Sequence, residues 1–94
     1  MESEKLLERK LRIGVEKRGG ECWKLAGGFV TGLPDRLILL PGGRAAFAEV
    51  KTTGEKPKPR QVYIIKLLLK LGFPVFVIDS EETLQKCLND ISEL

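Results

Sequence analysis

The first 18 residues carry apolar side chains at helical spacing among charged ones. One stripe is formed by Leu6, Leu7, Leu11, Ile13 (or Gly14) and Val15. Residues three and four apart share one face of a helix, and a glycine after the stripe is a common stop signal. Gly19 and Gly20 supply that signal. The pattern therefore predicts a helix from Ser3 to Arg18.

Extended segments follow this helix. Residues 21–25 alternate and predict a short strand, and the glycines and Pro34 of residues 26–34 predict a loop. Asp35 to Leu40 and Ala45 to Thr52 are two further extended runs, joined by Pro41-Gly42-Gly43-Arg44. Glycine pairs between two such runs are typical of a tight turn. The two runs are therefore expected to form an antiparallel hairpin.

The second half of the chain predicts a helix, a strand and a helix. After polar residues 53–59, Arg60 to Leu71 is apolar nearly all round, which predicts a helix buried on more than one side. Val75 to Ile78 predicts a strand covered on both faces. Asp79 or Ser80 can cap the last helix, with Glu82 in its first turn. Its inward side chains would be Leu84, Cys87, Leu88 and Ile91.

The expected order is α-β-β-β-α-β-α, which predicts a mixed α/β fold with a central sheet flanked by helices. Ninety-four residues correspond to one domain, expected over residues 1–94. A core this small would gain from a partner subunit. No apolar run approaches the roughly 20 residues that span a bilayer, so we expect no membrane partner and a cytoplasmic location.

Composition narrows the possible chemistry. The chain has no histidine, which excludes a Ser-His-Asp triad and a histidine-ligated zinc site. Cys22 and Cys87 lie far apart in sequence, without the spacing of a disulfide framework. A formal net charge of +3 permits an anionic partner without requiring one. Catalysis would have to use carboxylates, lysine, arginine, amides or a hard metal ion.

The hairpin brings three charged residues together. A turn at Gly42-Gly43 sets Asp35 opposite Glu49, or within one residue of it, and opposed side chains share a face. Two carboxylates that close repel unless a cation lies between them. Lys51 follows on the same face, about 6.6 Å further along. The alternative is a solvated Glu-x-Lys ion pair beside a Pro-Asp turn.

These residues resemble the PD-(D/E)xK nuclease superfamily, and more narrowly its VRR-NUC domain in the stand-alone form found in phages and prophages. The resemblance rests on Gly32-Leu33-Pro34-Asp35-Arg36, on Phe47-Ala48-Glu49-Val50-Lys51 and on Gln61 at a helix start. With the first acidic helix, Pro41-Gly42-Gly43 and the strand after Gly72, it covers nearly the whole chain. Val50 stands where the family usually has leucine. The resemblance implies a restriction-endonuclease-like core.

It also implies a role for each matching residue. Asp35, Glu49 and the carbonyl of Val50 would ligate Mg²⁺ or Mn²⁺, with an acidic residue from the first helix. Glu4 and Glu8 both qualify for that position, and Glu4 fits the family spacing better. Lys51 would orient the attacking water and stabilise the transition state, and Gln61 would position Lys51 or the water. No small-molecule cofactor is expected.

The expected partner is DNA. Lys24, Arg36, Lys56, Lys58 and Arg60 are the candidate phosphate contacts. Trp23 is expected in the core rather than as a base-stacking platform. The resulting hypothesis is a metal-dependent, structure-selective DNA endonuclease that resolves four-way (Holliday) junctions as a homodimer. The alternatives are a non-catalytic nucleic-acid-binding module and a monomeric nonspecific nicking nuclease.

Overall fold

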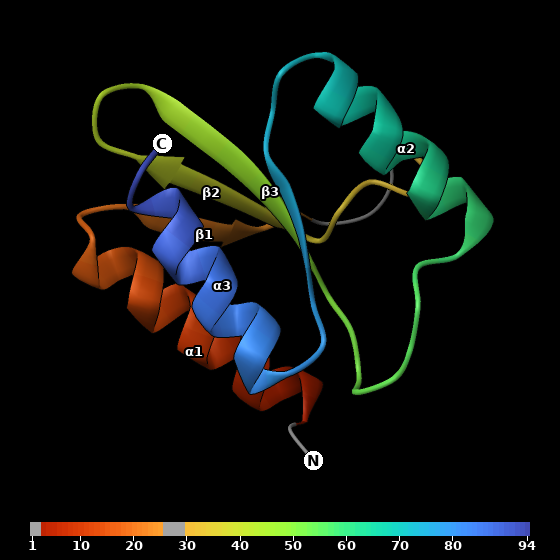
Figure 1. Ribbon diagram of the computed structural model, residues 1–94, viewed down its shortest axis with the longest axis horizontal. Helices are drawn as coiled ribbons and strands as arrows, with labels where there is room; N and C mark the ends of the chain where they lie inside the picture. Colours follow the sequence, from red (N-terminus) through yellow and green to blue (C-terminus); the bar gives the residue numbers. More distant parts are fainter. Residues whose placement is uncertain (1–2, 26–29) are drawn as a thin grey trace.

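The computed structural model describes residues 3–25 and 30–94, and the elements within these ranges follow the expected order. They are α1 (Glu4–Lys17), β1 (Glu21–Lys24), β2 (Arg36–Leu40), β3 (Arg44–Val50), α2 (Pro59–Lys70), β4 (Val75–Ile78) and α3 (Glu81–Ile91). Figure 1 shows a mixed sheet with α1 and α3 side by side against it and α2 set apart at one end. The predicted fold class is confirmed.

The four strands lie in sequence order across one sheet, β1-β2-β3-β4. The first two pairings are antiparallel, and β4 lies parallel to β3. The crossover between β3 and β4 contains α2. In the hairpin, Arg36 pairs with Ala48 and Leu40 with Arg44, so paired numbers sum to 84 as the glycine turn predicts.

The core lies between the sheet and the layer formed by α1 and α3. Its members are Leu7, Leu11, Val15, Cys22, Ile38, Leu40, Ala46, Ala48, Val50, Ile78, Leu84, Cys87, Leu88 and Ile91. The two helices approach closely at Gly14, where an added Cβ would lie 2.6 Å from Leu88 Cδ1. An alanine at this crossing would therefore require the buried Leu88 side chain to shift.

The opposite face of the sheet is much less covered, and two expectations about burial were wrong. In α2 only Ile64 is buried, whereas Tyr63, Leu69 and the C-cap residue Leu71 are 57, 51 and 64% exposed. Trp23 is 52% exposed rather than part of the core. Both expectations assumed that more elements cover this face than residues 3–25 and 30–94 provide, since α1 and α3 lie together on the other face.

Strand β4 was also expected to be covered on both faces, and this was wrong in part. It is an edge strand, and only Ile78 is buried while Val75, Phe76 and Val77 are half-buried. The continuous apolar run of β4 therefore belongs to an edge strand that is only partly covered, and not to a strand buried on both faces.

Element boundaries differ from the expectations by one or two residues. Ser3 and Arg18 cap α1 rather than belonging to it, and Ser80, not Asp79, caps α3 through its hydroxyl and the N–H of Thr83. Helix α2 begins at Pro59, because proline at a first helical position needs no hydrogen-bond partner for its nitrogen.

Part of the expected 26–34 loop, residues 26–29, lies outside the described residues. No helix of the described ranges has the length and apolar character needed to cross a membrane.

Candidate nuclease site

The β2–β3 hairpin joins Asp35 and Glu49 through reciprocal contacts at its open end. The backbone N–H of Asp35 donates to Glu49 Oε1 at 3.1 Å, and the N–H of Val50 donates to Asp35 Oδ1 at 3.2 Å. Continuing the Arg36–Ala48 register by one residue gives the same pairing. The structure therefore brings together the two carboxylates that the hairpin geometry predicted.

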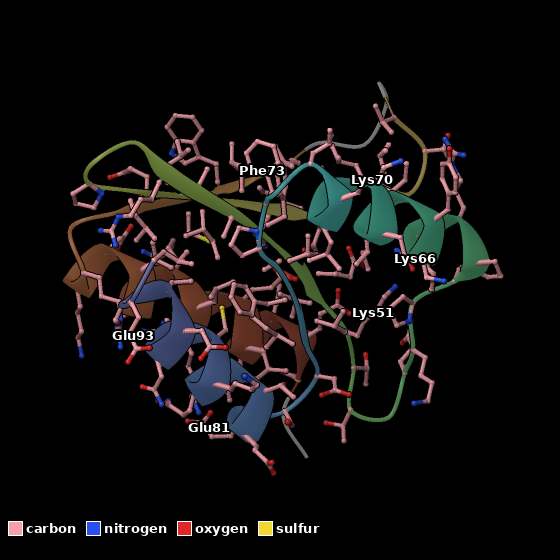
Figure 2. All side chains as sticks on the ribbon, turned by 45° about the horizontal axis from the view of Figure 1, so that its top comes forward. Lys51, Lys66, Lys70, Phe73, Glu81 and Glu93 are labelled. Atoms are coloured by element: carbon pink, nitrogen blue, oxygen red, sulfur yellow. The ribbon has the colours of Figure 1, made fainter. Side chains whose placement is uncertain are left out.

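The second oxygen of Glu49 is contacted by two more candidate residues. Glu49 Oε2 lies 3.2 Å from Lys51 Nζ and accepts a hydrogen bond from Gln61 Nε2 at 3.0 Å. Glu49 and Lys51 are only 5 and 9% exposed, so this ion pair is buried. Figure 2 shows Lys51 in the space between the end of β3 and α2. A buried charge pair with well-defined partners is a costly arrangement, typical of a functional site.

Gln61 is held at both ends of its amide. Its Oε1 accepts a hydrogen bond from the backbone N–H of Lys58 at 2.8 Å, which leaves its NH₂ group to donate to Glu49. The two partners fix the orientation of the amide, because only one of its ends can donate. Gln61 thus connects the first turn of α2 to the buried carboxylate.

A second group of acidic residues adjoins Asp35 from α1. Carboxylate oxygens of Glu4, Glu8 and Asp35 all lie within 4.8 Å of one another. The start of α1 is fixed by the Ser3 hydroxyl, which accepts from the N–H of Leu6 at 3.1 Å. The sequence offered Glu4 or Glu8 as alternatives, and the structure brings both to Asp35.

Asp35 is surrounded by other carboxylates, which disfavour its ionised form. Burial, and then the charge of Glu49, raise its pKa to about 6, while the N–H of Val50 and the charge of Arg36 act in the opposite direction. Oxygen-only donors with excess negative charge fit a hard divalent cation such as Mg²⁺ or Mn²⁺. The residues present are thus chemically suited to the metal that the family resemblance implies.

Arg36 has a different position from the one expected of a DNA contact. Its side chain is 13% exposed and forms an ion pair with Glu8, with NH2 bonded to Oε2. Its Nε is buried without a hydrogen-bond partner among the described residues. Arg36 lies two residues before Ile38, which is buried in the core, so its side chain is on the α1 side of β2. Alternation along β2 could have indicated this orientation.

The other candidate DNA contacts lie on the surface. Lys24, Lys56, Lys58 and Arg60 are all exposed. Arg60 also has structural contacts: its Nε donates to the carbonyl of Thr31 at 2.9 Å, and its guanidinium lies 5.1 Å from the ring centre of Tyr63. Gly32 allows this approach, because it has φ +87° and an added Cβ would lie 2.8 Å from the Arg60 carbonyl oxygen.

A mixed α/β sheet with an aspartate, a Glu-x-Lys segment and a helical glutamine at one end is the arrangement that the resemblance to α/β nucleases implies. Comparisons with known proteins agree. A solved structure titled "VRR_NUC domain" superposes with a TM-score of 0.84, at 32% sequence identity over 92% of this chain and 94% of that one. The chain is 41% identical over 76 residues to "Putative nuclease p44" of Acyrthosiphon pisum secondary endosymbiont phage 1, covering 81% of this chain and 82% of that protein.

The chain therefore belongs to the VRR-NUC family, and it is a nuclease. This confirms the resemblance that the sequence motifs indicated. No family model matches the chain.

Proposed function

We propose that this nuclease is a metal-dependent DNA endonuclease whose reaction centre is formed by Asp35, Glu49 and Lys51. The observation that carries the proposal is the buried contact of Lys51 Nζ with Glu49 Oε2 at 3.2 Å, beside an aspartate surrounded by other carboxylates. Burying these charges costs free energy that a purely structural hairpin could avoid with apolar side chains. A reaction on a phosphodiester accounts for that cost.

The proposed ligands of Mg²⁺ or Mn²⁺ are Asp35, Glu49, the carbonyl of Val50 and one carboxylate of α1, either Glu4 or Glu8. When bound, the ion would acidify water and neutralise charge on the phosphate. The closeness of Glu4 and Glu8 to Asp35 supports a ligand from α1, and the ion pair of Glu8 with Arg36 leaves Glu4 the more available of the two. This agrees with the spacing argument from the sequence.

Lys51 is the proposed group that stabilises the transition state. Its ammonium is a compact positive charge in a buried position, where electrostatic stabilisation of a phosphorane-like oxygen is strong. Gln61 is a positioning residue in this proposal, because it donates to the same Glu49 oxygen that Lys51 contacts. It would keep that carboxylate in place while substrate binds.

The proposed DNA track is formed by Lys24, Lys56, Lys58 and Arg60. The segment 56–60 runs directly into α2 and is connected to Glu49 through Gln61. Phosphate contacts there would position the strand without reading its sequence.

We further propose selectivity for branched DNA and cleavage of four-way junctions by a homodimer, since one site cuts only one strand. The exposed apolar residues of α2 support a dimer surface.

The proposal is tested by cleavage of a panel of labelled DNAs (duplex, single strand, flap and four-way junction) with Mg²⁺, Mn²⁺ or chelator. We expect Glu49→Gln and Lys51→Met each to lower the cleavage rate about 100-fold or more. Lys86→Met on α3 is the matched control and should cleave normally. Circular dichroism would check that the variants fold.

Near-normal cleavage by Glu49→Gln, or cleavage in chelator, would contradict the proposed metal centre. Binding of DNA without cleavage under any metal condition would favour the alternative, a non-catalytic binding module. Equal nicking of duplex and junction by a monomer would favour the nonspecific nicking nuclease.

A further inference from the structure

Trp23 presents a large aromatic side chain on the face of the sheet opposite the core. Its neighbour Cys22 is buried in the core, and alternation along β1 therefore directs Trp23 to the other face. Trp23 is 52% exposed, and its Nε1 donates to Glu21 Oε1 over a long distance of 3.4 Å. Tryptophan is highly buried on average, and this is the one tryptophan of the chain, so its exposure is unusual.

The pairing of β1 and β2 sets Trp23 beside the candidate nuclease site. Trp23 lies opposite Leu37, and the ladder continues through the N–H of Leu25, which donates to the carbonyl of Asp35 at 2.8 Å. In this register Asp35 is the diagonal neighbour of Trp23, and such positions are separated by about 7–8 Å. That separation is about two stacked nucleotides of a DNA strand, at about 3.4 Å each.

The surroundings of Trp23 on its face of the sheet are apolar. Lys24 is exposed at the next position of β1, and alternation directs it, with its cross-strand partner Arg36, to the opposite face. The apolar side chains of Leu37 and Phe47 continue across the sheet in register. An exposed aromatic ring on an apolar surface is the part of a single-strand binding site on which a base stacks.

We infer that Trp23 is a positioning residue on which an unpaired nucleobase stacks, one or two nucleotides from the phosphate held at Asp35. This inference rests on the proposed cleavage of DNA at Asp35, Glu49 and Lys51. A base inside a regular duplex has both faces covered by its neighbours, so only an unstacked base can use the indole. Trp23 therefore selects substrates with an unpaired or distorted strand at the cleavage point.

The unique tryptophan makes the contact directly measurable. Fluorescence excited at 295 nm would be followed while a twelve-residue oligothymidylate or a matched twelve-base-pair duplex is added to the full chain in chelator. We expect quenching by the single strand, with little change from the duplex. An oligonucleotide carrying 5-iododeoxyuridine should crosslink on irradiation to the peptide that contains Trp23.

Two variants separate stacking from a merely structural role. Trp23→Leu retains apolar bulk and should raise the Kd for the single strand, and the KM for junction DNA, about tenfold. Trp23→Phe keeps an aromatic face and should restore most of that loss. Neither variant should change kcat more than a few-fold, because the indole is not a reacting group.

The possible failures are distinguishable. If the wild type cleaves DNA but the single strand neither quenches Trp23 nor crosslinks to it, this inference is wrong and the proposed function stands. A blue shift of the emission with rising protein concentration, without DNA, would show that a second copy covers Trp23 and would also overturn it. If the wild type cleaves no DNA at all, both the proposed function and this inference fail.

Discussion

At the scale of single residues, the carboxyl group of Asp35 is under opposing influences. Burial and Glu49 oppose its ionisation, while one backbone N–H and Arg36 favour the ionised form. A divalent cation would reverse this balance, because it stabilises the ionised form far more strongly than a neighbouring N–H. The metal-free and metal-bound proteins should therefore differ most at this position.

Asp35 gives a prediction about stability and pH in chelator. Its pKa is about 6 in the folded state, against an ordinary value of 3.8. Between these two pH values the folded state therefore keeps a proton that the unfolded state has lost. The contribution of Asp35 to stability is therefore greatest below about pH 4 and is lost as pH rises through 6. Allowing for solvent screening at a partly exposed group, the loss is about 1 kcal/mol. Urea unfolding at pH 4.5 and 7.5 would measure it.

Asp35→Asn should remove this pH dependence and be more stable than the wild type at pH 7.5 in chelator. Asp90→Asn on α3 is the control, and its pH profile should run parallel to that of the wild type. Adding Mg²⁺ at pH 7.5 should stabilise the wild type and not Asp35→Asn. Identical profiles for wild type and Asp35→Asn would contradict the placement of this carboxyl beside Glu49.

At the scale of elements, the first turn of α2 connects a basic segment to the buried site. Lys58 caps the helix with its backbone, Pro59 begins it, and Gln61 reaches Glu49. The lysines of this segment point into solvent, whereas Arg60 is held by Thr31 and Tyr63. Within this segment, Lys56 and Lys58 are thus the most accessible of the proposed phosphate contacts.

Replacing Lys56 and Lys58 together with alanine should weaken DNA binding and reduce its dependence on salt. Each phosphate contact contributes about 0.9 to the slope of log K against log salt for duplex DNA, so the slope should fall by about 1–2. Fluorescence anisotropy of labelled DNA between low and physiological salt would measure it. The control variant, Lys17→Ala combined with Lys86→Ala, removes the same charge from other helices. It should keep the wild-type slope of log K against log salt. An unchanged slope for the Lys56/Lys58 variant would exclude this segment as the track.

Prediction from the sequence succeeded where neighbours along the chain determine the geometry. The Pro41–Arg44 turn fixes a register that leaves Asp35 against Glu49, and alternation then places Lys51 on the same face. It failed where the answer depends on which layers cover an element. Trp23 and most apolar residues of α2 are exposed because no described element packs over them, and no local pattern contains that information.

At the scale of the whole molecule, the two faces of the sheet are unequal. One face is covered by α1 and α3, which approach each other closely at Gly14 and Leu88. The other carries α2 at one end, with apolar residues facing solvent over much of the helix. Figure 2 shows Lys66 and Lys70 along this helix, so its exposed surface is mixed rather than purely apolar. A surface of this kind fits a subunit interface with a polar rim.

A homodimer through α2 should have a mass of twice 10.5 kDa in sedimentation equilibrium at micromolar concentration. Leu67→Glu, at a position 40% exposed, should shift the protein toward monomer and lower paired cleavage of junctions more than nicking of duplex. Leu6→Glu on α1 changes an equally exposed leucine and should remain dimeric. A wild type that sediments as a monomer at all concentrations would exclude the dimer.

The hairpin has a further consequence for the order of folding. Asp35 and Glu49 meet through contacts between close neighbours in sequence, whereas β4 pairs with β3 only after a loop of more than 20 residues has closed. Local contacts form with less loss of chain entropy, so the β2–β3 hairpin is expected early. The two carboxylates then repel each other before the rest of the sheet exists. A cation that bridges them would therefore accelerate refolding, and the ion that we propose for cleavage would also assist the chain in reaching its native state.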